Sequence, residues 1–176
     1  MSLITRETRE TSIRIEVRRE GTIAVDTTVP FLDHMMVTWA RYAGIGLDLK
    51  ASGDLKHHII EDVAIAAGLA VREEFQPPIR RYGHQTIPMD DAVVECALDL
   101  GGRPFYRGPL PSSLYDHWMR SFADHAECTL HLMTKRGTDR HHIVEAGFKA
   151  LGMALAQAIE PVREIASTKG TVRVGK

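Results

Sequence analysis

The sequence has little of what marks a secreted, membrane-bound or nucleic-acid-binding protein. Its only cysteines, Cys96 and Cys128, have no Cys-x-x-Cys spacing, so we predict two buried free thiols rather than a disulfide. No apolar run is long enough to cross a bilayer, and the first residues lack the apolar core of a secretion signal. Net charge is −1, which gives no bulk attraction to nucleic acid or anionic membranes. We therefore expect a cytoplasmic protein with neither as a partner.

Histidine is the residue that stands out in an otherwise ordinary soluble composition. Six of the nine histidines fall in two phrases that each occur twice. HHIIED at residues 57–62 returns as HHIVEA at 141–146, and DHMM at 33–36 returns as DHWM at 116–119. An Ala-x-Gly-x-Ala pattern at 66–70 also recurs at 150–154. The repeats indicate a duplicated half-domain.

The pattern of apolar residues predicts the same order of elements twice. In the first half, a strand over 13–17 turns at 20–21 into a returning strand over 22–27, forming a hairpin. A helix from Pro30 toward Tyr42, a strand over 45–49 and a helix to about Phe75, capped by Asp54, follow. The second half has a strand over 92–100 paired with 103–107, a helix over 114–123 capped by Ser112-Ser113, a strand over 128–132 and a helix over 141–159 capped by Asp139.

These elements predict a two-layer α+β fold made by tandem duplication of a β-β-α-β-α half-domain. Each half is expected to form a mixed four-stranded sheet with its helices on one face. We place the halves at 1–84 and 85–176, fused as one compact unit without a flexible linker.

The repeated phrases have the composition of a metal site. Residues three or four apart share one face of a helix, so His57 and His58 both lie near Glu61. The two adjacent imidazoles diverge by roughly 100° around the axis, so we expect each to serve a different ion. Imidazole and carboxylate without thiolate suit Mn, Fe, Co or Zn. The predicted ligands are His34, His57, His58, Glu61, His117, His141, His142 and Glu145. The alternative is a set of ordinary helix-surface contacts, which the duplication disfavours.

Nine short motifs carry a resemblance to a known family over residues 6–170. They are TRET at 8–11, FLDHM at 31–35, GDL at 53–55, RYG at 81–83, PMDDA at 88–92, GRP at 102–104, HIVEA at 142–146, FKA at 148–150 and STKG at 167–170. In this order they resemble imidazoleglycerol-phosphate dehydratase.

The resemblance implies a metal-dependent hydro-lyase of histidine biosynthesis that converts imidazole glycerol phosphate to imidazole acetol phosphate. It implies two Mn²⁺ per active site, although other divalent ions are possible, and an imidazolate that expels the hydroxyl through a diazafulvene-type intermediate. It also implies homo-oligomers of twenty-four subunits with metal sites between neighbours. The eight ligands of the family fall on the residues chosen by spacing.

Further site residues follow from the same resemblance. The substrate phosphate needs cations and hydroxyls, and the matching residues are Arg81, Arg103, Lys149, Ser167 and Lys169. Glu10 and Asp90 match carboxylates near the substrate and are candidate acid–base residues, although either could serve only a structural ion pair or turn.

Some positions depart from the commoner family pattern. The loop before His57 is shorter, Thr38 replaces a Gln, Tyr42 stands near a usual His, and Ile59 follows the first pair. A hydrolase that uses the same ligands on a phosphorylated small molecule, and a non-catalytic metal-storage protein, are the alternatives that the residues alone leave open.

Overall fold

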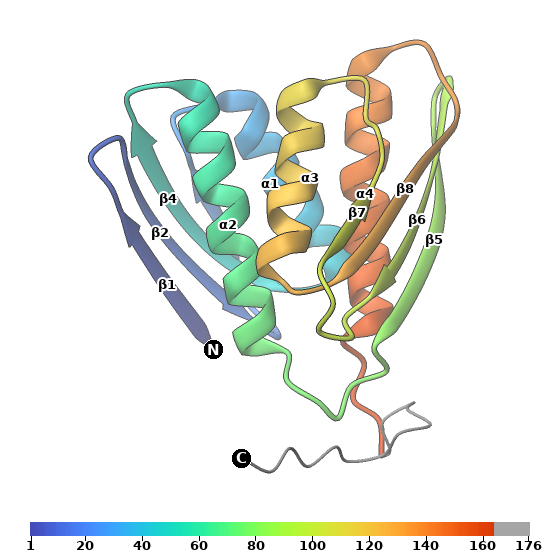
Figure 1. The fold of residues 1–176 in the computed structure, drawn as a ribbon, viewed down its shortest axis with the longest axis horizontal. Coiled ribbons are helices and arrows are strands. Elements are labelled where there is room, and N and C mark those ends of the chain that lie inside the picture. Colours follow the sequence, from blue (N-terminus) through green and yellow to red (C-terminus); the bar gives the residue numbers. More distant parts are fainter. Residues whose placement is uncertain (164–176) are drawn as a thin grey trace.

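Two mixed β-sheets enclose four helices in the computed structural model, which describes residues 1–163 (Figure 1). The first half contains β1 (Ser2–Glu7), β2 (Thr11–Arg18), β3 (Ile23–Asp26), α1 (Pro30–Ala43), β4 (Gly46–Gly53) and α2 (Lys56–Glu74). The second contains β5 (Tyr82–Met89), β6 (Ala92–Asp99), β7 (Phe105–Arg107), α3 (Ser113–His125), β8 (Thr129–Arg136) and α4 (Arg140–Ala158).

The two sheets have the same topology. Their strand orders are β1-β2-β4-β3 and β5-β6-β8-β7, with only the last pair of each sheet parallel. Ile13, Ile15 and Val17 of β2 are fully buried and alternate with exposed or half-buried residues, so one face of the sheet packs on helices. The α+β class, the duplication and the mixed four-stranded sheets are therefore confirmed. The predicted β-β-α-β-α order is present in each half, with one further strand, β1 or β5, before it.

The predicted strand partners are wrong in both halves. β3 does not return along β2 as a hairpin but lies parallel to β4, and β7 lies parallel to β8 rather than beside β6. In each case a helix, α1 or α3, connects the two paired strands, and a β-α-β crossover places its strands in parallel. β2 has β1 and β4 as its neighbours, so no free edge remains for β3. The second sheet begins at Tyr82, three residues before the expected start of the second half.

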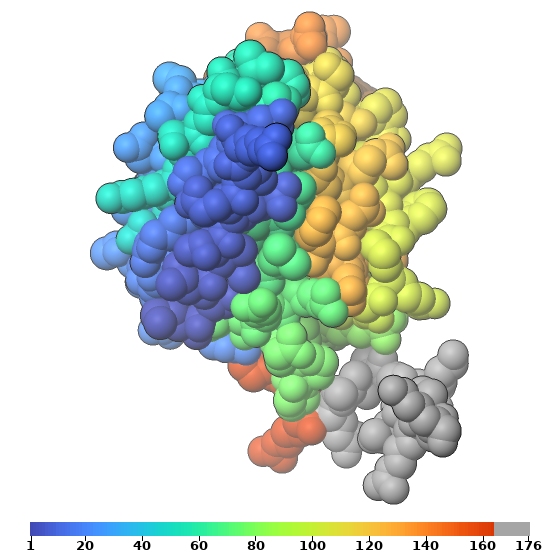
Figure 2. Space-filling model, turned by 60° about the vertical axis from the view of Figure 1, so that its left-hand side comes forward, coloured from blue at the N-terminus to red at the C-terminus, as the bar shows by residue number. Residues whose placement is uncertain are grey.

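The halves meet through their helices, with α1 against α4 and α2 against α3. Glycine permits both crossings: a Cβ on Gly152 would lie 2.7 Å from the Trp39 carbonyl oxygen, and one on Gly68 would lie 2.7 Å from the Phe122 carbonyl oxygen. Across this seam the Trp39 ring of α1 lies edge-on to Trp118 and Phe122 of α3, with ring-centre distances of 6.4 and 5.8 Å. The space-filling view shows residues of the first half (blue to green) directly against those of the second (yellow to orange) (Figure 2). The glycine of the repeated Ala-x-Gly-x-Ala pattern thus lies at the seam in each half.

The helix caps confirm one prediction fully and contradict another. Asp139 accepts hydrogen bonds from the backbone N–H groups of His141 and His142, as expected of an N-cap. Ser112 occupies the N-cap position of α3 but makes no capping bond with its side chain. Asp54 is not the N-cap of α2, which begins after Leu55; its carboxylate accepts from His58 instead.

Both cysteines are buried and free, as predicted, and burial raises the pKa of Cys128 to about 12. Among residues 1–163, no helix is long and apolar enough to cross a membrane.

Candidate metal centre

The first cluster of predicted ligands forms where α1 of one half meets α4 of the other. His34 Nε2 lies 3.2 Å and His141 Nε2 lies 3.1 Å from the same oxygen, Oε2 of Glu145. One ligand atom from each of the three residues lies within 4.8 Å of the other two. Glu145 is 6 % exposed, whereas both imidazoles are half exposed. Two nitrogens and one oxygen thus converge on a single point that is open to solvent.

The other oxygen of Glu145 has a separate partner. Lys149, one helical turn later on α4, places its Nζ 3.0 Å from Oε1. Burial alone would raise the pKa of Glu145, but the hydrogen bonds from Lys149 and His34 outweigh it, so its pKa is lowered and it is ionised at neutral pH. An ionised carboxylate with one oxygen engaged by an ammonium group offers its second oxygen to a cation.

The second cluster is the counterpart of the first across the seam. His117 on α3 places its Nε2 3.3 Å from Oε1 of Glu61 on α2, and His57 lies one turn before Glu61 on the same helix. Glu61 is more exposed than Glu145, with 42 % of its side chain accessible. Each cluster therefore combines the His of the Asp-His-x-Met phrase from one half with the Glu of the His-His-x-x-Glu phrase from the other.

His58 and His142 take no part in the clusters of this chain. Nδ1 of His58 lies 2.7 Å from Oδ1 of Asp54, and Nδ1 of His142 lies 2.8 Å from Oδ1 of Asp91. These hydrogen bonds raise the pKa of both imidazoles. The rings of His141 and His142 are perpendicular, which agrees with the expectation that the members of a pair face different surroundings.

The candidate acid–base residues lie beside His58 and His142. Glu10, in the turn between β1 and β2, has its Oε2 3.6 Å from His58 Nδ1. Asp90, in the turn between β5 and β6, has its Oδ2 3.4 Å from His142 Nε2. Both carboxylates are largely exposed. The structure thus places one candidate in the same hairpin turn of each half.

Sequence reasoning missed Asp91 as part of this region. Its Oδ2 accepts hydrogen bonds from Thr138 N–H, Thr138 Oγ1 and Asp139 N–H, while Oδ1 faces His142. The Thr138 backbone bond, followed by the contact with His142, holds the pKa of Asp91 far below its usual range. Asp91 and His142 are 51 residues apart, so no local spacing signals the pair. Asp54, four residues before His58 on the chain, could have been found from its spacing.

The predicted phosphate-binding residues are dispersed within one chain. Lys149 belongs to the first cluster. Arg81 instead forms a two-point ion pair with Asp99, with Nε–Oδ1 and Nη2–Oδ2 distances of 2.5 and 2.9 Å. Arg103 is exposed at the turn that follows Gly102. Ser167 and Lys169 lie outside the described residues.

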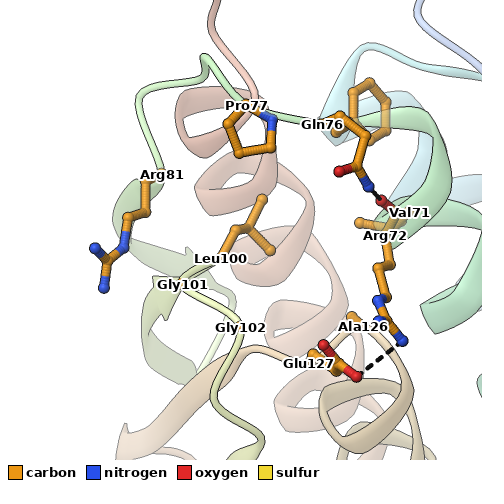
Figure 3. A pocket seen from close by; sticks show the side chains of 11 residues that line it. Val71, Arg72, Gln76, Pro77, Arg81, Leu100, Gly101, Gly102, Ala126 and Glu127 are labelled. Carbon is orange, nitrogen blue, oxygen red and sulfur yellow. Dashed lines mark hydrogen bonds and ion pairs between the residues drawn. The ribbon is translucent and has the colours of Figure 1, made fainter. Parts of the chain in front are cut away.

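Arg81 also lines a cavity of about 410 Å³ between the ends of α2 and α3 (Figure 3). Its guanidinium points away from the other lining side chains and packs against Gly101, where a Cβ would overlap it. None of the predicted metal ligands is among the residues that line this cavity. The cavity is therefore separate from both clusters in one chain.

The positions that depart from the family pattern have different surroundings. Thr38 and Ile59 are buried in the core. Tyr42 is 38 % exposed, and Lys149 Nζ lies 5.6 Å from the centre of its ring, so Tyr42 borders the first cluster.

The donors in both clusters fit a divalent transition-metal ion. In the first cluster two imidazole nitrogens and a carboxylate oxygen already approach one another, and in the second Nε2 of His117 faces Glu61. Such donors without thiolate suit Mn²⁺, Fe²⁺ or Zn²⁺. In the absence of a cation, Nε2 of His34 and Nε2 of His141 would both have to use Oε2 of Glu145 as their hydrogen-bond acceptor.

Comparisons with known proteins agree on one family. A family model described as imidazoleglycerol-phosphate dehydratase matches residues 27–155. Proteins of that name from Pyrobaculum aerophilum and Methanopyrus kandleri are 44% and 39% identical to this chain. The matches cover 95% of this chain and 97% of the first relative, and 98% and 96% for the second.

Two solved structures of that name have the same fold. The structure from Pyrococcus furiosus superposes with a TM-score of 0.88 at 34% identity, covering 96% of this chain and 100% of its own. The structure from Staphylococcus aureus has a TM-score of 0.79 at 26% identity, covering 92% and 100%.

Proposed function

Because this chain belongs to the imidazoleglycerol-phosphate dehydratase family and is a hydro-lyase of histidine biosynthesis, we propose that it dehydrates imidazole glycerol phosphate with two divalent ions, Mn²⁺ being the expected metal. The observation that carries the metal proposal is the approach of two Nε2 atoms, from different halves, to one oxygen of Glu145. Family membership favours dehydration over the hydrolase and storage alternatives. A cytoplasmic location is part of the proposal.

One ion would be held by His34, His141 and Glu145, and the other by His117, His57 and Glu61. His58 and His142 would then complete the metal sites of neighbouring subunits, since they face away from the clusters of their own chain. This arrangement supports a homo-oligomer, and the family resemblance implies twenty-four subunits. The substrate site would accordingly lie between chains.

The metal supplies Lewis acidity at the substrate's imidazole ring, which matters because no carbonyl acidifies the carbon that loses its proton. The residues of the chain supply the remaining requirements. Lys149, beside the first cluster, would bind the phosphate by a charge-assisted hydrogen bond. Arg81, oriented by Asp99, and Arg103 are at the other end of the molecule and would serve a neighbour's site, with Ser167 and Lys169 as further contacts.

Proton transfer would fall to the carboxylates in the hairpin turns. Dehydration breaks one C–H and one C–O bond, and the leaving hydroxyl needs a proton to depart as water. Glu10 and Asp90 are exposed and adjacent to His58 and His142, so they would reach a substrate bound there. The resulting enol then converts to the ketone product.

The proposal is tested with metal-stripped protein, imidazole glycerol phosphate and added Mn²⁺, measuring ketone formation and bound metal. His34→Ala and His117→Ala should each lower bound Mn²⁺ from two ions per chain to about one and abolish turnover, because each removes a ligand from a different cluster. His84→Ala is the matched control, since His84 is exposed on β5 and outside both clusters. Full metal content and activity in His34→Ala would refute the proposed sites.

A further inference from the structure

His58 and His142, the two histidines outside the clusters of their own chain, share a feature that the clusters do not have. Nδ1 of His58 and Nδ1 of His142 each face a carboxylate oxygen at hydrogen-bond distance, 2.7 and 2.8 Å. In the clusters it is Nε2 that faces the carboxylate. Nε2 of His142 has Asp90 Oδ2 at the longer distance of 3.4 Å. A carboxylate at Nδ1 favours the tautomer with its proton on that nitrogen, which leaves the lone pair on Nε2.

The two halves obtain this contact from different parts of the chain. Asp54 precedes His58 by four residues, whereas Asp91 comes from the β5–β6 turn, 51 residues before His142. The offset that relates His58 to His142 relates Asp54 to Thr138, which is not acidic. The nearest carboxylates to the two Nδ1 atoms therefore come from positions that do not correspond in the two halves. The hairpin turn of the first half adds a more distant carboxylate, with Oε2 of Glu10 3.6 Å from Nδ1 of His58.

Asp91 is also fixed more firmly than an exposed carboxylate would be. Three donors from Thr138 and Asp139 hold its Oδ2, so its Oδ1 is directed at His142. These donors belong to the loop that leads into α4, the helix that carries His142. One carboxylate therefore links a hairpin turn, a helix start and an imidazole ring.

We propose that Asp91 and Asp54 are positioning residues that hold the rings and tautomers of His142 and His58 so that Nε2 is presented to a divalent metal. The inference rests on the proposed function, in which these histidines are metal ligands. Carboxylates at the far nitrogen of a metal-binding imidazole raise its basicity and fix its direction. An amide at the same place can donate to Nδ1, which favours the tautomer that blocks Nε2.

The test is the affinity of metal-free protein for Mn²⁺, measured by the EPR signal of the free ion during titration. Asp91→Asn and Asp54→Asn should keep two ions per chain at saturation but weaken the dissociation constant of the affected site by about 10- to 100-fold. Asp48→Asn is the matched control, because Asp48 lies on β4 and its one ionic partner among residues 1–163 is Arg14. Its affinity should equal that of the unaltered protein.

The outcomes separate this inference from the proposed function. His142→Ala with unchanged Mn²⁺ stoichiometry and affinity would overturn the ligand assignment itself. Loss of metal in His142→Ala, together with unaltered affinity in both Asp→Asn variants, would overturn only the positioning role. A purely structural role for Asp91 would lower the melting temperature of the metal-free protein without changing its Mn²⁺ affinity. If Asp91→Asn does not fold, Asp54→Asn decides, because within the described part of the chain the Asp54 side chain otherwise accepts a hydrogen bond from the Leu55 N–H alone.

Discussion

Gly152 provides a direct test of the seam between the halves. An alanine Cβ at this position would lie 2.7 Å from the Trp39 carbonyl oxygen and 3.1 Å from the Ala43 nitrogen, both backbone atoms of α1. Because backbone atoms cannot rotate away, α1 and α4 would have to separate. Gly147, on the same helix, is the matched control: its Cβ would meet only the methyl groups of Leu110, at 3.3 and 3.6 Å.

The two substitutions should change stability in opposite directions. Replacing a helical glycine by alanine stabilises by about 1 kcal/mol, whereas overpacking a core costs about 1–3 kcal/mol. Against backbone the upper figure applies, so Gly152→Ala should lose about 2 kcal/mol net. Gly147→Ala should gain about 0.5–1 kcal/mol, since a leucine methyl can shift by a few tenths of an ångström.

Thermal unfolding measures the difference directly. For a chain of this size, each 1 kcal/mol shifts the melting temperature by about 2–4 °C, so Gly152→Ala should melt about 4–8 °C lower and Gly147→Ala slightly higher. Metal-free samples at one protein concentration remove differences caused by metal binding or subunit association. A Gly152→Ala protein as stable as the unaltered one, or equal losses in both variants, would refute the close-crossing argument.

Two further substitutions test single contacts. Lys149→Met should raise the KM for the phosphorylated substrate by about 10- to 100-fold, which is what the loss of one charge-assisted hydrogen bond costs. The number of bound Mn²⁺ ions should stay at two per chain. Steady-state kinetics measure the KM, and an unchanged value would contradict the role of Lys149 in phosphate binding. Asp62→Asn should lower the free energy of unfolding by about 1.5–3 kcal/mol, because buried Asp62 accepts a hydrogen bond from the Thr11 hydroxyl and forms an ion pair with Arg6 2.9 Å away. Urea unfolding measures it, and a midpoint equal to that of Asp48→Asn, a change at a half-buried position on β4, would show that the contact contributes nothing.

The sequence was sufficient for the features that depend on local spacing. The His-His-x-x-Glu phrases lie on helices, where the spacing of residues fixes the face they share, and the structure brings the Glu of each phrase to the His of the Asp-His-x-Met phrase in the other half. The buried alternation of β2 likewise identified a strand, through its apolar core positions Ile13, Ile15 and Val17. Local periodicity reports such elements well because one face of each is uniformly buried.

The missed elements lack that periodic pattern. The inward side of β1 includes polar Ser2, and that of β5 includes Gly83 and Gln85, so neither strand alternates between apolar and polar residues. Gly83 is required because a Cβ there would overlap the backbone of Ala154 on α4. β5 is thus fixed by contact with a distant helix.

The strand partners and the Asp91–His142 contact could not be predicted from local sequence patterns either. The helix α1 separates β3 from β4 in the sequence, and the residues of β3 do not indicate which edge of the sheet this strand will join. The hydrogen bond from His142 to Asp91 spans 51 residues and forms because the fold places the β5–β6 turn beside the first turn of α4. Such long-range contacts follow from the assembled fold rather than from any one stretch of sequence.

The seam relates the halves as a two-fold axis relates the subunits of a symmetric dimer, with α1 on α4 matched by α2 on α3. In a true dimer of identical chains, any substitution would appear in both sites at once. Covalent fusion removes that constraint, and the two sites of this chain have diverged accordingly. Lys149 accompanies buried Glu145, whereas Ile65 occupies the corresponding place beside exposed Glu61. One chain thus carries one cluster whose carboxylate has an ammonium group beside it and one in which the corresponding position is apolar.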